Sequence, residues 1–171
     1  MSLLVYLMRH GIAADAAPGM NDADRALTAE GVSKTERVAI GLHKLGATPD
    51  LVLSSPLRRA EETARLVADV VNPKAQVELY PPLAGGFAIE DILKGLRPHR
   101  GARELLLVGH QPDLGELASH LLTGSARLIP LPFRKAGVAA IVVGAMPPRS
   151  PGSLEWFLTP GQLRAIANSR G

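Results

Sequence analysis

The chain has 171 residues, of which 46% are hydrophobic and 20% are charged. This length and balance favour one globular domain, residues 1–171, and exclude a largely disordered chain. There is no cysteine, which excludes disulfide bonds, thiolate metal sites and cysteine nucleophiles. The 19 Lys and Arg residues exceed the 16 Asp and Glu residues by three and are scattered along the chain, so we do not expect a nucleic-acid partner.

Neither a secretion signal nor a membrane span is expected. The first residues lack a basic segment followed by a long apolar run, and no stretch approaches the roughly 18 apolar residues that a span requires. We therefore expect a cytoplasmic protein without a membrane partner. We also expect a monomer, whose mild positive charge leaves anionic small molecules and phosphoproteins open as partners.

Short apolar runs alternate with segments of helical periodicity along the whole chain. Strands are predicted at 3–8, 51–53, 76–80, 104–109, 137–144 and 153–158. Helices are predicted at 28–46, 57–71, 88–96, 111–122 and 160–167. This alternation indicates an α/β fold, a three-layer sandwich in which helices cover both faces of a mostly parallel central sheet. The last two strands are expected to form an antiparallel pair at one edge of the sheet.

The segment 12–26, between the first strand and the first helix, is rich in Ala, Gly, Asp and Asn and contains Pro18. A loop of this length in a compact domain is typical of a lid or a binding loop. Its acidic residues are Asp15, Asp22 and Asp24. One of them could shape the mouth of a pocket, although a solvated loop is the simpler interpretation.

Three predicted strands end in residues that suit phosphate chemistry. The first runs into residues 9–11 (Arg-His-Gly), the second into residues 54–59 (Ser-Ser-Pro-Leu-Arg-Arg), and the fourth into residues 109–110 (Gly-His). The carboxyl ends of parallel strands form the ligand crevice of open α/β sheets, so these side chains can meet there. Arginine offers bidentate hydrogen bonds to phosphate oxygens, and a neutral histidine can attack phosphorus.

These motifs resemble those of the histidine phosphatase superfamily, in particular its short phosphohistidine phosphatases of the SixA type. Residues 7–11 are similar to the family signature, residues 55–64 (Ser-Pro-Leu-Arg-Arg-Ala-Glu-Glu-Thr-Ala) to its second block, and residues 107–112 (Leu-Val-Gly-His-Gln-Pro) to its third. Residues 24–31 and 154–160 also resemble family stretches, so the resemblance covers nearly the whole chain. It implies the histidine phosphatase, or phosphoglycerate mutase-like, fold.

The resemblance also implies which residues are catalytic. His10 would be the nucleophile, with a backbone carbonyl holding its other N–H, and would form a phosphohistidine intermediate that water then hydrolyses. Arg9 and Arg59 would bind the phosphoryl oxygens, and His110 would donate a hydrogen bond to the same group. Arg59 is selected over Arg58 because it directly precedes the alanine of the second block. No metal and no organic cofactor are implied.

Two further expectations concern the same strand ends. We expect Gly11 to bind substrate together with the arginines and His110, because glycine lets the backbone turn and come close to a ligand. Ser54 and Ser55 are expected to cap the helix that follows them.

One departure from the family concerns the general acid. The mutase and sugar-phosphatase branches have a glutamate just after the third strand, whereas residues 83–86 here are Leu-Ala-Gly-Gly. The acid-phosphatase and phytase branch has an aspartate directly after the second histidine, where this chain has Gln111. Because an imidazole leaves more readily than an alkoxide, this absence favours phosphohistidine as substrate. Whether Asp15 or Asp113 acts as a general acid stays open.

Three functions are compatible with these residues. The first is hydrolysis of phosphohistidine on a phosphorylated protein. The second is hydrolysis of a small phosphate ester in the same pocket. The third is a module that binds phosphate without catalysis, which the presence of all four catalytic residues argues against.

Overall fold

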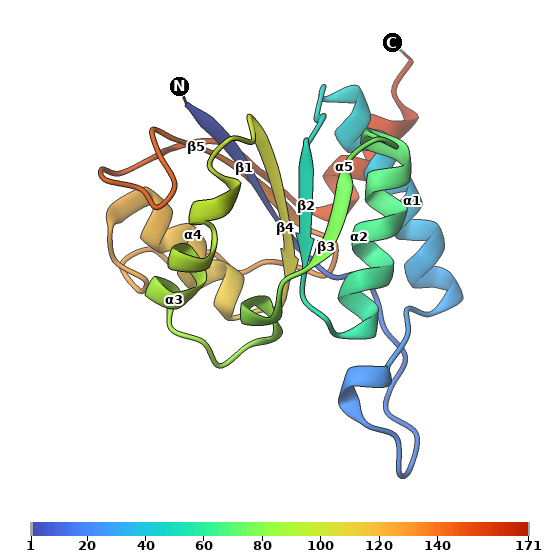
Figure 1. The fold of residues 1–171 in the computed structure, drawn as a ribbon. Coiled ribbons are helices and arrows are strands. Elements are labelled where there is room, and N and C mark those ends of the chain that lie inside the picture. Colours follow the sequence, from blue (N-terminus) through green and yellow to red (C-terminus); the bar gives the residue numbers. More distant parts are fainter. Residues whose placement is uncertain (1, 171) are drawn as a thin grey trace.

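The computed structural model describes residues 2–170, which form six strands and five α-helices (Figure 1). The strands are β1 (Leu3–Arg9), β2 (Leu51–Ser54), β3 (Gln76–Leu79), β4 (Glu104–Gly109), β5 (Val138–Val143) and β6 (Ser153–Leu158). The helices are α1 (Ala29–Lys44), α2 (Arg58–Val71), α3 (Ile89–Gly95), α4 (Asp113–Thr123) and α5 (Pro160–Asn168). Short 3-10 helices lie at η1 (Asp22–Asp24), η2 (Pro81–Ala84) and η3 (Arg97–His99).

All six strands belong to one sheet in the order β3-β2-β4-β1-β5-β6. β3, β2, β4 and β1 are parallel, whereas β5 is antiparallel to β1 and β6 is antiparallel to β5. The predicted antiparallel pair at a sheet edge is thus confirmed. In the β1–β4 register Arg9 lies opposite Gly109, so the residues that follow these two strands emerge side by side.

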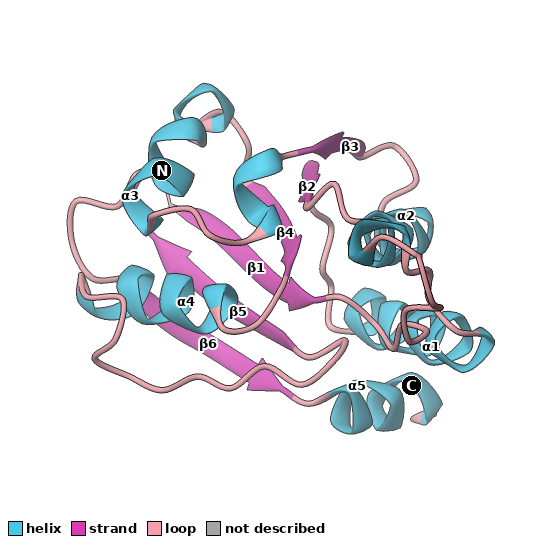
Figure 2. Cartoon of the chain, turned by 90° about the horizontal axis from the view of Figure 1, so that it is seen from below, coloured by secondary structure: helices cyan, strands magenta, loops and turns pink. Residues whose placement is uncertain are grey.

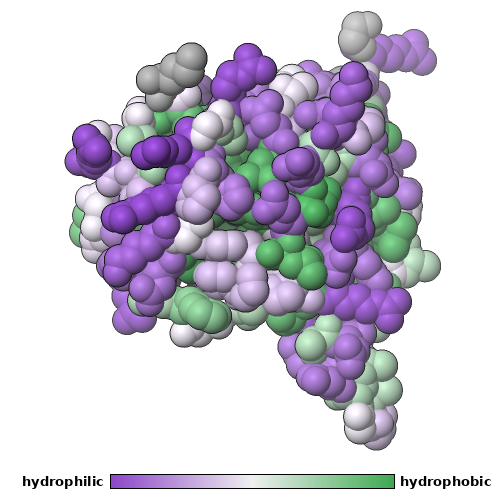
Figure 3. Space-filling view, viewed as in Figure 1, coloured by the Kyte–Doolittle hydropathy of each residue, from purple (hydrophilic) through white to green (hydrophobic). Residues whose placement is uncertain are grey.

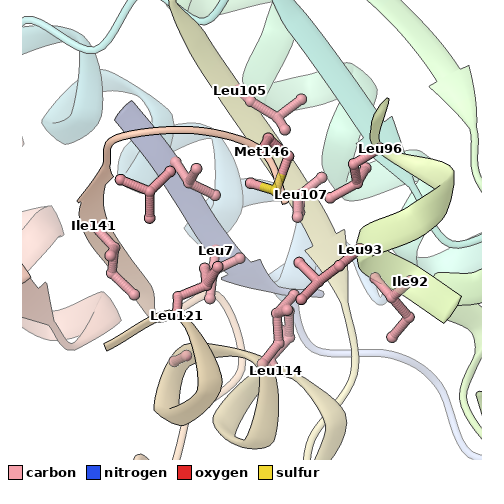
Figure 4. Close-up of a cluster of buried hydrophobic side chains, with 14 of the residues drawn as sticks. Leu7, Ile92, Leu93, Leu96, Leu105, Leu107, Leu114, Leu121, Ile141 and Met146 are labelled. Carbon is pink, nitrogen blue, oxygen red and sulfur yellow. The ribbon is translucent and has the colours of Figure 1, made fainter. Parts of the chain in front are cut away.

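Helices cover both faces of the sheet, which confirms the three-layer prediction (Figure 2). Because successive strand residues point to opposite faces, β1 contributes to two separate cores. Val5 and Leu7 pack with α3 and α4, and Tyr6 and Met8 pack with α1, α2 and α5. Figure 4 shows the first core, where Leu7 points toward the side chains of α4.

The helix boundaries follow local sequence signals closely. Thr28 caps α1 by accepting a hydrogen bond from the Gly31 N–H. Gly46, just after α1, has φ +83, a conformation that favours glycine. α4 begins at Asp113, two residues later than predicted. Within residues 2–170, no helix combines the length and apolar character that crossing a membrane would require.

Candidate active site

A cavity of about 430 Å³ opens beyond the carboxyl ends of β1, β2 and β4. The four residues that the sequence singles out, Arg9, His10, Arg59 and His110, all line it. Arg9 is the last residue of β1 and His10 follows it, Arg59 lies in the first turn of α2, and His110 comes directly after β4. The parallel arrangement of these three strands therefore brings the predicted residues together.

His10 is a neutral imidazole, and one of its ring nitrogens forms a hydrogen bond with the backbone. Its side chain is buried, and its Nδ1 lies 2.7 Å from the Gly11 carbonyl oxygen. Since a carbonyl can only accept, Nδ1 carries the proton and Nε2 keeps its lone pair. Burial lowers the pKa of His10 to about 3, against the effect of the Gly11 hydrogen bond. The expected backbone carbonyl is therefore present, and His10 is uncharged at neutral pH.

His110 lies beside His10, with 5.1 Å between the ring centroids. Its Nε2 is 2.7 Å from Ser55 Oγ, and Ser55 Oγ also accepts a hydrogen bond from the Leu57 N–H. When the Ser55 hydroxyl donates to Nε2, the neutral ring carries its proton on Nδ1. Burial, followed by the charge of Arg59, lowers the pKa of His110 to about 4.

The two arginines are fixed by backbone carbonyls. Arg9 Nη1 donates to Phe133 O at 2.9 Å, and Arg9 Nε is buried with no hydrogen-bond partner among residues 2–170. Arg59 Nη1 donates to Asp22 O at 2.9 Å, and Nη2 donates to Asp22 Oδ2 at 3.1 Å. A guanidinium has five N–H donors, so both side chains retain donors for an anion in the cavity.

Gly11 follows His10 in the chain but does not line the cavity. Its N–H donates to Thr63 Oγ1 at 3.0 Å, and a Cβ at this position would lie 2.5 Å from Thr35 Oγ1. Glycine is needed here for close packing against α1, and its carbonyl orients His10. This geometry corrects the expectation that Gly11 binds substrate, because its polar groups are already engaged.

Comparisons with a family model, with a curated protein and with a solved structure all lead to the same family. The model of the histidine phosphatase superfamily (branch 1) matches residues 5–84. The phosphohistidine phosphatase SixA of Escherichia coli is 29% identical over 163 residues, which cover 94% of this chain and 96% of that protein. A structure of the protein histidine phosphatase SixA complexed with tungstate superposes with a TM-score of 0.80 at 28% identity, covering 94% of this chain and 99% of the other. The chain belongs to the histidine phosphatase superfamily.

A further sequence match and a further structural match were found. An uncharacterised protein of Picosynechococcus is 40% identical over 144 residues, covering 82% of this chain and 86% of that protein. A phosphoglycerate mutase from Bacillus anthracis shares the fold, with a TM-score of 0.67 at 18% identity, covering 98% of this chain and 97% of the other. The predicted phosphoglycerate mutase-like fold is confirmed.

Two acidic residues, Asp22 and Asp113, line this cavity. Asp22 lies on η1, within the segment 12–26 that stands out from the body of the molecule (Figure 3). Its contact with Arg59 makes it the loop acid that shapes the cavity mouth, and this corrects the interpretation of a merely solvated loop. Asp15 is exposed and does not line the cavity.

Asp113 is the second cavity acid, and it enters from the start of α4. Its Oδ2 has no solvent-exposed surface and no hydrogen-bond partner among residues 2–170. Burial raises the pKa of the Asp113 carboxyl, and the negative charge of Glu116 adds to this, while the Gly86 backbone N–H acts in the opposite direction. Of the two acids left open by the sequence, only Asp113 is placed to reach a bound substrate.

Ser55 is the site residue that the sequence interpretation missed. Neither Ser54 nor Ser55 is the N-cap of α2, which is Leu57. Ser55 is fully buried, and its Oγ accepts a hydrogen bond from the Leu57 N–H and also bonds to His110. Ser55 comes directly after β2, and β2 is the neighbour of β4, the strand that leads to His110. This position was the signal that could have placed Ser55 in the site.

We predict that Ser55→Ala lowers kcat for an aryl phosphate by about tenfold with little change in KM, because His110 loses the group that orients its protons. Ser54→Ala is the matched control, since Ser54 is equally buried but donates to the Ser55 carbonyl and not to His110. Equal losses in the two variants would contradict an orienting role for Ser55.

We also predict that the free energy of unfolding decreases as the pH falls from about 6.5 toward 4. The unfolded chain binds protons at His10 and His110 near their ordinary pKa of 6.5, whereas the folded chain does not. Urea unfolding across this pH range should show a shallower decrease for His10→Gln. A control variant, His43→Gln, changes an exposed histidine of α1 and should keep the wild-type slope. An unchanged slope in His10→Gln would contradict the prediction.

Proposed function

We propose that this phosphatase hydrolyses phosphohistidine in a phosphorylated protein, through a covalent phosphoenzyme at His10. Family membership and the similarity to SixA support phosphatase activity. One observation carries the catalytic proposal: a neutral His10, with Nδ1 bound to Gly11, shares one cavity with Arg9, Arg59 and His110.

In the first step, His10 Nε2 attacks phosphorus in line with the bond to the substrate imidazole. The new N–P bond forms as the old one breaks, and the electron pair of the broken bond goes to the leaving imidazole. That ring has taken a proton from solvent on its other nitrogen and leaves neutral, while His10 becomes an imidazolium with its proton on Nδ1. Arg9, Arg59 and His110 donate hydrogen bonds to the phosphoryl oxygens and stabilise their charge. Because the donors are fixed before substrate arrives, little reorganisation is needed in the transition state.

In the second step, water attacks the phosphoryl group on His10. The N–P bond breaks, its electron pair returns to Nε2, and phosphate leaves with the oxygen of the water. The low pKa of His10 keeps the released imidazole neutral and ready for another cycle.

The leaving group favours phosphohistidine over an ester. Residues 83–86, at the end of η2, bring no acidic side chain to the cavity wall, although Ala84 and Gly85 line it. The free ring nitrogen of a phosphorylated imidazole can take a proton from water, so a neutral imidazole leaves without an acid from the enzyme, whereas an alkoxide needs a proton at the breaking bond. This stretch therefore supplies no general acid of its own, which suits a phosphoramidate substrate, although Asp113 of α4 lies beside Gly85.

A second candidate function is the hydrolysis of a small phosphate ester, and Asp113 is the observation that favours it. Its carboxyl lines the cavity, and burial raises its pKa, which increases the protonated fraction that could donate a proton to an alkoxide. The two candidates differ in leaving group and can be separated by kinetics.

Rapid-quench experiments with a phosphohistidine protein and with an aryl phosphate should show an acid-labile phosphoenzyme. We expect the label in wild type and in a His120→Ala control, whose histidine lies on α4 outside the cavity, but not in His10→Ala. We expect faster labelling from phosphohistidine. Faster labelling from the aryl phosphate would favour the second candidate, and no label from either donor would contradict both.

We predict that Asp113→Asn reduces kcat for an alkyl phosphate by about 100-fold and for an aryl phosphate by at most about twofold, because only the alkoxide needs an acid. Asp91→Asn is the control, since it changes an exposed acid of α3 that does not line the cavity. Equal losses on both substrates would assign Asp113 to the support of the adjacent Gly85–Gly86 backbone and contradict an acid role.

A further inference from the structure

A groove of about 510 Å³ adjoins the catalytic cavity. Half of its lining residues are basic, and none of those described is acidic; the basic ones are Arg9, Lys34, Arg134, Lys135 and Arg164. Arg9 and Lys135 line the catalytic cavity as well. We call these five residues the basic groove. It extends the positive charge of the catalytic cavity outward, past the position of the phosphoryl group.

The basic groove is assembled from four parts of the chain. Arg9 ends β1, Lys34 lies on α1 and Arg164 on α5, two helices that lie side by side (Figure 2). Arg134 and Lys135 lie in the turn before β5. Four segments distant in sequence thus place positive charge along one hollow.

The turn that carries Arg134 and Lys135 is tied to the catalytic strand. The Ala136 N–H donates to the carbonyls of both Arg9 and His10 at 3.0 Å, and the Gly137 N–H donates to Arg134 O at 2.7 Å. Ala136 adopts φ +62, a conformation that is uncommon for alanine and is retained where the surroundings require it. Lys135 is therefore held at the border between groove and cavity.

Little negative charge compensates the groove. Glu30 pairs with Lys34 at 2.6 Å and also faces Arg164. Within residues 2–170, no ion pair involves Arg9, Arg134 or Lys135. Such an arrangement attracts an anionic group and leaves donors for it.

We propose that the basic groove binds an acidic segment of the phosphoprotein substrate while the phosphorylated side chain occupies the catalytic cavity. This inference rests on the function proposed above. The catalytic cavity accounts for one phosphoryl group, and aspartate or glutamate side chains near the phosphorylated residue would supply the further negative charge that the groove attracts. The groove thereby selects and steers acidic partners, an effect that weakens with ionic strength.

The test uses two phosphohistidine peptides that differ only in having Asp and Glu, or Asn and Gln, beside the phosphorylated residue. Wild type should have a kcat/KM about tenfold higher for the acidic peptide at low salt. The double variant Arg134→Gln/Arg164→Gln, whose residues do not line the catalytic cavity, should lose most of this preference. Its hydrolysis of an aryl phosphate should be unchanged, which also shows that it is folded.

A matched control removes the same charge elsewhere. Arg100 and Arg149 line a separate cavity, of about 690 Å³, near the start of β1 and away from the catalytic residues. The double variant Arg100→Gln/Arg149→Gln should keep the preference for the acidic peptide.

Two results would overturn the proposal: no preference for the acidic peptide in wild type, or equal loss of preference in both double variants. Either can occur while the phosphohistidine peptides are still hydrolysed, and the function proposed above would then stand. Failure of wild type to hydrolyse either peptide, with aryl phosphate activity intact, would instead reject the phosphohistidine substrate itself and the groove proposal with it.

Discussion

The parallel pairing of β1 with β4 places Arg9 opposite Gly109, so that His10 and His110 leave the sheet at the same level. The rest of the site depends on this register. A shift of one residue would turn each side chain of β1 to the other face of the sheet and exchange the contents of the two cores. The fully buried residues on both faces of β1 and β4 oppose such a shift, so core packing maintains the geometry of the two imidazoles.

Hydrogen bonds from the surrounding chain then orient the reactive groups. The Gly11 carbonyl fixes one nitrogen of His10, and the Gly11 N–H is bound to Thr63, whose hydroxyl donates to the Arg59 carbonyl at 2.7 Å. His10, the proposed nucleophile, and Arg59 are therefore linked through α2. Burial, which keeps both imidazoles neutral, also strengthens the interaction of the arginines with an anion, because less water screens their charge.

Charge is distributed unevenly around this centre. Asp22, on the projecting segment 12–26, occupies two donors of Arg59, and Asp113 enters from the opposite side through α4. Beyond Arg9, the basic groove continues the positive surface without comparable compensation. A substrate that approaches along the groove meets positive charge first and the acids only at the cavity, which is consistent with an anionic macromolecule as partner.

The sequence by itself determined the α/β class, the edge pair of antiparallel strands and the convergence of Arg9, His10, Arg59 and His110. Buried strands and amphipathic helices have local periodicities, and the carboxyl ends of parallel strands meet at one edge, so these features are encoded in short stretches. Only the tertiary structure decided that Ser55 bonds to His110, 55 positions away, and that Asp22 bonds to Arg59, 37 positions away. It also decided that the Gly11 carbonyl bonds to His10 Nδ1 and that five basic side chains line one groove. Such contacts depend on strand order and on the packing of separate segments, and no local pattern carries that information.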